Sequence, residues 1–335
     1  MKILISDVTD SYIFPGGKQV LVHKLLQNLI DIGIDVEFEN WHDPNLKPDV
    51  VHFLGFNNLY KLKKLKAQGC KLILTHIMDH WTSRSDRDKN IQLVKNWFFK
   101  KLPVQFFPMF PWTALDIFDH IVYLHEEDRK SAIKLYGINP EKSSVIPHAV
   151  DSLVQFESNS PSDNYLICVA SIYERKNSLL TARICNELQI PIIFIGPSWE
   201  KNSDYFKEFS KEMTGGSSQY LGFVSEEEKQ VLLKNAKGFV LLSEAESGCI
   251  AIYEAATYGL PILISDLPWA KSYSNPINLF WTNVRNKDEL KVNMKSFYEN
   301  AQKSLQASFK IMVWKEIAEK YADVYKKCLS QETPA

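Results

Sequence analysis

Short apolar runs alternate along the first half of the chain with stretches in which apolar residues recur at helical spacing. The runs predict strands at residues 1–7, 36–38, 50–54, 72–75, 120–124 and 144–146, and the spaced stretches predict helices at 20–32, 58–68 and 126–136. Alternation of this kind favours a parallel α/β sheet with right-handed crossovers. Ligands of such sheets bind at the carboxyl ends of the strands.

The same alternation restarts in the second half, after a segment at 151–163 that loses periodicity and gains Ser, Pro and Asn, as linkers do. Strands are predicted at 165–170, 192–195, 220–221, 238–242 and 261–264, and Ser225 with Glu228 forms a capping box that opens a helix to about residue 236. We therefore expect two Rossmann-like domains, 1–150 and 151–310, followed by a helix and tail at 311–335. The last helix has an apolar stripe made by Trp314, Ile317, Ala318, Tyr321, Val324 and Cys328. Which domain it packs on stays open, and a return to the N-terminal domain is one of the two options.

Composition narrows the function classes. The 335 residues suffice for two domains, and apolar and charged fractions of 45% and 24% are typical of a soluble globular protein. A net charge of -1 argues against a nucleic-acid partner. The five cysteines are scattered without C-x-x-C spacing, so neither a disulfide framework nor a zinc site is indicated, and a reducing cytoplasm fits best. No apolar run approaches the length of a membrane span.

The richest functional signal lies at residues 243–266. A polar turn follows the strand at 238–242, and an apolar helical run that starts near Gly248 ends at Gly259 and Pro261. A helix N-terminus at that place suits a phosphate. Glu246 and Glu254 could line one crevice and bind hydroxyl groups of the same ligand, which describes a nucleotide sugar. The alternative is a solvated loop acid and an ordinary helix residue.

Further candidates lie where other predicted strands end. Arg175 and Lys176 follow the strand at 165–170, where they are either cations for a diphosphate or solvated loop residues. A glycine pair, Gly16-Gly17, opens the first helix and is either an anion contact or a turn. Candidate histidines near strand ends, each either catalytic or a packing residue, are His52, His76 and His80.

Two other patterns need an interpretation. Asp86-Arg-Asp88 matches the D-x-D triplet by which some sugar transferases hold a metal, but it lies in the charged segment 83–90, so we expect a solvated loop and no metal site. Aromatic residues are dense at 97–112. Together with Lys61, Lys63, Lys64 and Lys66 they could form a surface that rests on an anionic membrane, although insertion into the core is the favoured interpretation.

In their order along the chain, these features resemble the retaining family 4 glycosyltransferases of the GT-B fold, of the group 1 type. The segments that carry the resemblance are Phe14-Pro-Gly-Gly17, Asp49-Val-Val-His52, Pro147-His148-Ala-Val-Asp151, Gly222-Phe-Val-Ser225, the E-x7-E pair Glu246 and Glu254 with Gly259 and Pro261, and Val313-Trp-Lys-Glu-Ile-Ala318. The resemblance implies an α/β GT-B fold, in which the parallel sheets of two Rossmann-like domains face a central cleft.

The resemblance also implies roles for donor-binding residues. Glu254 would hold the ribose hydroxyls, Glu246 would face the transferred sugar as a catalytic residue, and Lys176 would bind the diphosphate. Backbone N–H groups for the phosphate or sugar would come from Gly248, Cys249 and Ile250, and Gly222 and Phe223 would lie beside the base. The family's paired arginine is Ser171 here. A hydrogen bond to a charged group is worth about 1.5–3 kcal/mol, so either Arg175 substitutes or donor affinity is low.

For the N-terminal domain the resemblance implies a catalytic histidine, for which His76 and His80 compete, and an acceptor side at Gly16, Gly17 and His148. The implied activity moves a sugar, with retention and without a metal or other cofactor, from a nucleoside diphosphate sugar of the UDP or GDP type to a glycan, lipid-linked or other acceptor. Its expected setting is bacterial surface polysaccharide synthesis, in the cytoplasm at the inner face of the membrane. The alternatives are a weak or inactive nucleotide-sugar-binding protein of the same fold, and another GT-B enzyme such as an epimerase or a phosphorylase.

Overall fold

A computed structural model describes residues 1–7, 16–40, 43, 46–56, 58–99, 115–151, 164–273, 278–300, 302–303 and 311–330; the side chains of residues 79, 80, 99 and 272 are outside this description. The chain forms two compact units. The first comprises Met1–Ala149 with Met312–Ala335, and the second comprises Val150–Ile311.

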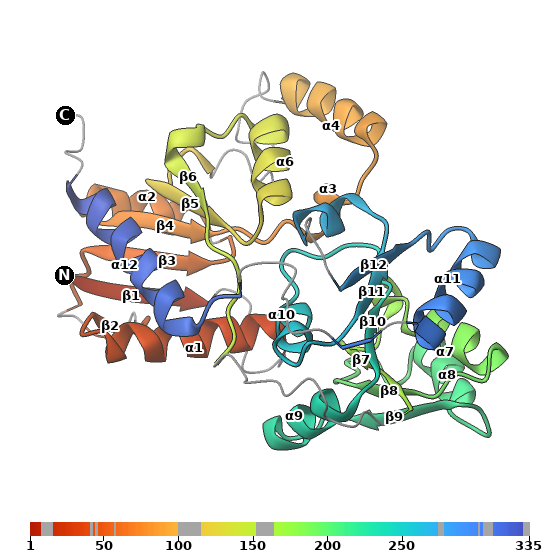
Figure 1. Cartoon of the computed structure of the whole chain (residues 1–335). Helices are drawn as coiled ribbons and strands as arrows, with labels where there is room; N and C mark the ends of the chain where they lie inside the picture. The colour runs from red at the N-terminus through yellow and green to blue at the C-terminus, as the bar shows by residue number, and fades with distance from the viewer. Residues whose placement is uncertain are drawn as a thin grey trace. The chain divides into compact units, whose positions relative to one another are not determined.

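The first unit is built on a six-stranded parallel sheet in the order β2-β1-β3-β4-β5-β6 (Figure 1). Its strands are β1 (Lys2–Asp7), β2 (Asp35–Phe38), β3 (Val50–Leu54), β4 (Lys71–Thr75), β5 (His120–Tyr123) and β6 (Ser143–Val145). Its helices are α1 (Gly17–Asp31), α2 (Leu59–Ala67), α3 (Asp79–Thr82), α4 (Asp86–Phe99), α6 (Glu126–Tyr136) and α12 (Trp314–Ser330). Every residue of β3 and β4 is buried, as expected for parallel strands that are covered on both faces.

Side-chain alternation along β3 separates the two faces of this sheet. Val51 and Phe53 pack in a cluster with apolar side chains of α2 and α6. On the other face, His52 hydrogen-bonds through Nδ1 to Tyr325 Oη at 2.8 Å and through Nε2 to Thr75 Oγ1 at 2.8 Å. Tyr325 belongs to α12, which packs on α1 over that face (Figure 1).

The packing of α12 settles where the last helix belongs. Its buried stripe carries Trp314, Ile317, Ala318, Tyr321, Ala322, Tyr325 and Cys328. Tyr325 takes the place predicted for Val324, which is only half-buried. Because Tyr321 Oη also bonds Thr75 Oγ1 at 3.0 Å, the helix completes the core of the first unit.

The second unit repeats the architecture, with a parallel sheet in the order β12-β11-β10-β7-β8-β9. Its strands are β7 (Leu166–Val169), β8 (Ile192–Ile195), β9 (Ser218–Gly222), β10 (Gly238–Leu241), β11 (Ile262–Ser265) and β12 (Leu279–Thr282). Its helices are α7 (Ser178–Glu187), α8 (Asp204–Glu212), α9 (Glu226–Asn235), α10 (Ile250–Thr257) and α11 (Lys287–Asn300). From β7 the chain runs outward through β8 and β9, then returns to β10 on the other side of β7. The strand order therefore reverses between β7 and β10, the place where open α/β sheets bind ligands.

Some sequence-based expectations are wrong in detail. Asp86 and Asp88 lie in the first turn of α4 rather than in a loop, and Ser85 caps this turn, because its Oγ accepts from Asp88 N at 3.2 Å. The patterns for α8, α11 and β12 were not recognised. The predicted linker, apart from Asp151, and the aromatic residues 100–112 lie outside the described residues. Within the part of the chain that is described, no helix has the length and apolar character needed to cross a membrane.

Candidate functional site

Two loops meet where the strand order of the second unit reverses. One loop follows β7 and contains a short 3₁₀ helix, Glu174–Lys176, and the other follows β10. The N–H of Glu244 donates to the Arg175 carbonyl at 2.8 Å, and Asn177 Nδ2 donates to the Leu242 carbonyl at 2.8 Å. The Asn177 backbone is left-handed, with φ at 52°, and asparagine is one of the few non-glycine residues that adopt this conformation readily. Neighbouring strands thus bring the two loops together.

The loops join three candidate residues in one charged cluster. Lys176 Nζ lies 2.5 Å from Glu246 Oε1, and Arg175 Nη1 lies 3.5 Å from Glu246 Oε2. Arg175 also donates to the Ala245 carbonyl and to Tyr173 Oη. The Glu246 side chain is 6% exposed and that of Lys176 is 13% exposed, so this ion pair is largely shielded from water.

Opposite charges in the cluster outweigh the cost of burial. Burial alone would raise the pKa of the Glu246 carboxyl, but Lys176 and then Arg175 overcome it and hold the pKa below its usual value. Likewise, burial alone would lower the pKa of Lys176, while Glu246 raises it above its ordinary value. Both groups are therefore charged at neutral pH. Lys176, which the sequence analysis expects to bind a diphosphate, is therefore paired with Glu246.

The turn before α10 only partly matches the expected anion site. Gly248 has φ at 104°, a conformation that favours glycine, and α10 begins at Ile250. The N–H of Cys249 donates to Tyr273 Oη at 3.0 Å. One of the three N–H groups predicted to face the ligand is therefore engaged by a buried tyrosine.

Glu254 belongs to a second cluster, which the sequence prediction did not anticipate. Lys229 Nζ lies 2.7 Å from Glu254 Oε1 and 2.8 Å from Glu226 Oε2. The pKa of Glu254 is raised, because burial outweighs the attraction of Lys229. The residues that line a pocket here are Val150, Asp151, Glu226, Lys229, Gln230, Leu233, Glu254, Thr257 and Tyr258. Lys229 follows the Gly222–Ser225 segment by one helical turn, and that spacing was the only sequence signal for it.

Glycines shape the neighbouring strand ends. Gly196, after β8, has φ at 137°, and a Cβ built there would lie 2.2 Å from the Ala170 carbonyl oxygen. Its N–H donates to the carbonyl of Gly222 at 2.8 Å, so three strand ends approach closely. Phe223 is 75% exposed, and Ser171 is half-buried after the end of β7. Within the described residues, neither side chain forms a hydrogen bond or ion pair with the charged clusters.

In the first unit, the predicted glycine pair opens α1. Lys18 Nζ lies 2.6 Å from Asp7 Oδ1 at the end of β1, so the start of the helix lies at the carboxyl edge of the sheet. Gly16 has φ at 173°, which any residue adopts, and a Cβ there would meet no described atom within 4 Å. Packing therefore gives no reason for glycine at this position. His148 is buried, with its ring 6.5 Å from that of Trp314 in an edge-on arrangement.

His76 and His80 are the two histidines that compete as the catalytic residue of the first unit. His76 follows β4, is 6% exposed and lies among the rings of Phe56, Tyr123 and Tyr136. Burial lowers its pKa to about 3, so its imidazole is neutral. His80 lies in α3, and its side chain is outside the described part. Both stay predictions as catalytic residues.

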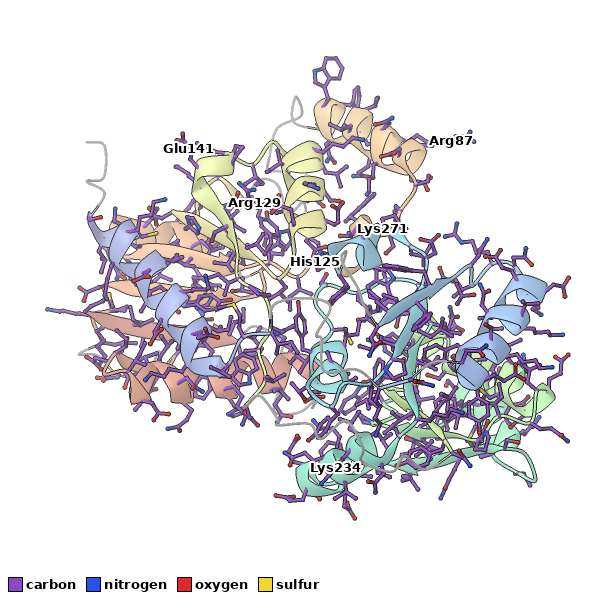
Figure 2. The ribbon with its side chains drawn as sticks, viewed as in Figure 1. Arg87, His125, Arg129, Glu141, Lys234 and Lys271 are labelled. Carbon is purple, nitrogen blue, oxygen red and sulfur yellow. The ribbon has the colours of Figure 1, made fainter. Side chains whose placement is uncertain are left out.

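His125 is a third histidine at this edge, which the sequence analysis did not select. It caps α6 by accepting from Asp128 N at 3.3 Å through Nδ1 (Figure 2). Its Nε2 lies 3.4 Å from Asp128 Oδ2. Its place in the sequence was the available signal for this role, because the residue directly before an acidic first helical turn stands at the N-cap. Across the described ranges, no group of three or more His, Cys, Asp or Glu side chains is arranged to hold a metal ion.

Comparisons with known proteins agree with this architecture. Residues 152–310 match the family model "Glycosyl transferases group 1". Among curated proteins, none matches the sequence. A solved glycosyltransferase of Rickettsia africae is similar over 99% of both chains with a TM-score of 0.69 at 12% identity. HepE of Anabaena, solved in complex with UDP and glucose, is similar over 98% of this chain and 100% of its own, with a TM-score of 0.69 at 16% identity.

At these identities the solved structures show the fold, while the family model identifies the second unit. AviGT4, a glycosyltransferase involved in avilamycin A biosynthesis, is similar over 99% of both chains with a TM-score of 0.63 at 18% identity. The two six-stranded parallel sheets, each with its own helices, match the α/β fold of these GT-B structures. Residues 152–310 therefore match the group 1 glycosyltransferases, and the whole chain has the GT-B fold.

Proposed function

We propose that this enzyme transfers a sugar from a nucleoside diphosphate sugar, with the donor bound at the strand reversal of the second unit. The observation that carries the proposal is the cluster of Lys176, Arg175 and Glu246 beside β7 and β10. A second acidic residue, Glu254, lines a pocket of the same unit. Diphosphate, ribose and sugar together require cations and hydroxyl-binding carboxylates, and this unit supplies both.

In the proposed scheme, the donor diphosphate displaces Glu246 and becomes the partner of Lys176. Negative charge develops on the diphosphate as its bond to the sugar breaks, so a lysine held beside it lowers the barrier. Glu246, once released, faces the sugar. Glu254 binds the ribose hydroxyls, and the scheme calls for no metal or other cofactor.

The finer parts of the proposal concern the outcome of transfer and the acceptor. We propose that the anomeric configuration is retained, and that the acceptor is a glycan or a lipid-linked saccharide bound on the Gly16, Gly17 and His148 side of the first unit. A role in polysaccharide synthesis on the cytoplasmic face of a membrane follows from such an acceptor. The solved relatives with UDP bound support a uridine donor as the first to test.

The donor is best found by measuring thermal stability with UDP, GDP, ADP and their sugars. We expect one nucleoside diphosphate to raise the melting temperature, and its sugar conjugate to be slowly hydrolysed or transferred. Glu246→Gln should abolish turnover and keep the stabilisation by the diphosphate. If none of these compounds stabilises the protein, the donor site is misassigned. Proton NMR of the product's anomeric centre then tests retention.

A nucleotide-sugar-binding protein with little turnover is the second candidate. It is favoured by Ser171, which replaces the arginine expected from the resemblance, and by the engagement of Lys176 with Glu246. Turnover above background that disappears in Glu246→Gln would exclude it.

A further inference from the structure

The pocket that Glu254 lines in the second unit is acidic. Its lining includes the carboxylates of Asp151, Glu226 and Glu254 and the ammonium group of Lys229. Among the described residues that line it, carboxylates therefore outnumber cations. Such a pocket repels a phosphate and suits an uncharged group that donates hydrogen bonds, such as a sugar hydroxyl.

Lys229 joins the two helices on either side of this pocket. It stands one turn after Glu226 on α9, and its Nζ lies 2.8 Å from Glu226 Oε2 and 2.7 Å from Glu254 Oε1 on α10. The side chains of Lys229 and Glu254 are 16% and 18% exposed, whereas that of Glu226 is 51% exposed. The pair with Glu254 is thus largely shielded from water, and the pair with Glu226 lies at the surface.

The bond to Lys229 occupies one oxygen of the Glu254 carboxylate. The other oxygen, Oε2, forms no hydrogen bond or ion pair with any residue that the structure describes. Thr257 also lines the pocket, but its Oγ1 donates to the backbone carbonyl of Glu254 at 2.7 Å rather than to the carboxylate. One carboxylate oxygen is therefore available to a ligand hydroxyl.

The charges around Glu254 decide how readily it binds a proton. Burial raises the pKa of its carboxyl above the ordinary value, and Lys229 opposes this rise. Glu226 and Asp151 repel the carboxylate and add to the rise. Burial raises the pKa of Tyr258, the remaining titratable group of the lining, so its phenol is neutral. Lys229 is therefore the cation that favours the charged form of Glu254.

We propose that Lys229 is a positioning residue that fixes Glu254 as an oriented carboxylate, so that the pocket selects an intact ribose over a deoxyribose. The inference rests on the proposed function, in which Glu254 binds the ribose of the donor. A hydrogen bond to a charged acceptor is about twice as strong as one to a neutral acceptor. The charge that Lys229 maintains on Glu254 is then what distinguishes the two sugars.

The test compares UDP, GDP and ADP with their 2′,3′-dideoxy analogues in calorimetric titrations from about pH 5 to about pH 9. Both members of a pair carry the same base and diphosphate, so the ratio of their affinities reports the ribose contact. For the preferred base, we expect the wild type to bind the ribonucleotide about tenfold more tightly than the analogue. This ratio should fall as the pH drops through the raised pKa of Glu254, because the carboxylate is the form that binds.

Three variants distinguish a positioning role from structural support. Lys229→Met should lower the ratio at neutral pH and move its fall to higher pH by about one unit or more, because the opposing cation is gone. Lys229→Arg should restore the wild-type ratio, since it keeps the charge. Glu226→Gln should move the fall to lower pH, because it removes a repelling charge from Glu254. A structural role would not produce shifts in opposite directions.

The chain offers a matched control in Lys234, on the same helix (Figure 2). This lysine is exposed and forms no ion pair within the described part of the chain. Lys234→Met should therefore keep the wild-type ratio at every pH. Should Lys229→Met not fold, Glu226→Gln decides the question, because its side chain is at the surface. An unshifted pH profile in Glu226→Gln would then overturn the proposal.

Pyrophosphate, which has no ribose, separates this inference from the donor proposal. The wild type and Lys229→Met should bind it equally. If none of the three nucleotides and no pyrophosphate binds to the wild type, the donor site is misassigned and both proposals fall. If a ribonucleotide binds more tightly than its analogue, and Lys229→Met keeps that ratio and its pH profile, the role of Lys229 is refuted while the donor proposal stands.

Discussion

Replacing Glu246 by glutamine removes the negative charge that is paired with the buried Lys176. The side chain at position 246 keeps its shape. Breaking a buried ion pair by removing one partner costs about 3–5 kcal/mol. We expect about 3 kcal/mol here, the lower end, since the Lys176 side chain keeps 13% exposure and can lose its proton. Arg175, bonded to the Ala245 carbonyl and to Tyr173, should hold the loop in place. The free energy of unfolding in urea measures the loss.

The same substitution should have the opposite effect on ligand binding. In the proposed scheme, a diphosphate displaces Glu246 from Lys176 of the wild type, and a hydrogen bond to a charged group is worth about 1.5–3 kcal/mol. Without the carboxylate this cost disappears, so Glu246→Gln should bind the nucleoside diphosphate about tenfold more tightly. Calorimetric titration with UDP and with GDP measures the change. Transfer should be lost at the same time, because the proposed scheme needs the Glu246 carboxylate to face the sugar.

Lys176→Met and the double variant serve as the controls. Lys176→Met should weaken diphosphate binding and destabilise the protein, because it leaves Glu246 buried with Arg175 as its remaining cation. The double variant should be more stable than either single one, since two neutral side chains replace the pair. Equal stability of Glu246→Gln and wild type would refute the argument from burial. Equal diphosphate affinity in wild type, Glu246→Gln and Lys176→Met would refute the exchange of partners.

Three further predictions concern other parts of the two units. Glu254→Gln should weaken nucleoside diphosphate binding about tenfold and leave pyrophosphate binding unchanged in calorimetry, since only the ribose contact is altered; equal losses for both ligands would contradict the ribose role. Burial lowers the pKa of His76 from 6.5 to about 3, so below pH 6.5 the unfolded chain binds a proton that the folded protein does not. The free energy of unfolding is therefore highest above pH 6.5 and falls as the pH drops toward 3. Between about pH 7 and about pH 5, the free energy of unfolding in urea should fall by about 2 kcal/mol less in His76→Phe than in the wild type. An unchanged pH dependence would show that burial does not lower this pKa. Gly196→Ala should lower the free energy of unfolding by about 2–4 kcal/mol, because its Cβ would collide with the Ala170 carbonyl; an unaltered unfolding midpoint would argue against this close approach.

Periodicity predicted two α/β domains with parallel sheets because buried parallel strands are continuous apolar runs, easily seen in a sequence, whereas the GT-B fold was implied by the family resemblance. Residues 50–54, for example, form β3 with the predicted bounds. Helix α4 escaped prediction for a physical reason. Polar Lys89 and Asn96 are buried while Ile91 and Val94 are exposed, and Leu93 is half-buried, so the helix has no single apolar stripe facing the core.

Sequence order identified the loops of the site, but not their contacts. Glu246 and Lys176 are 70 positions apart, and only the pairing of β7 with β10 makes them neighbours. Similarly, Lys229 lies 25 positions from Glu254 and carries no motif of its own. Ion pairs between loops depend on strand order, which periodicity does not specify.

The assignment of α12 to the first unit has a consequence for how the protein is made. The second unit, Val150–Ile311, is one continuous segment, so all of its residues are synthesised before α12. The first unit still lacks the helix that supplies Tyr321 and Tyr325 to His52 and Thr75. During translation the first unit therefore lacks part of the cover of one face of its sheet until the second unit has been synthesised.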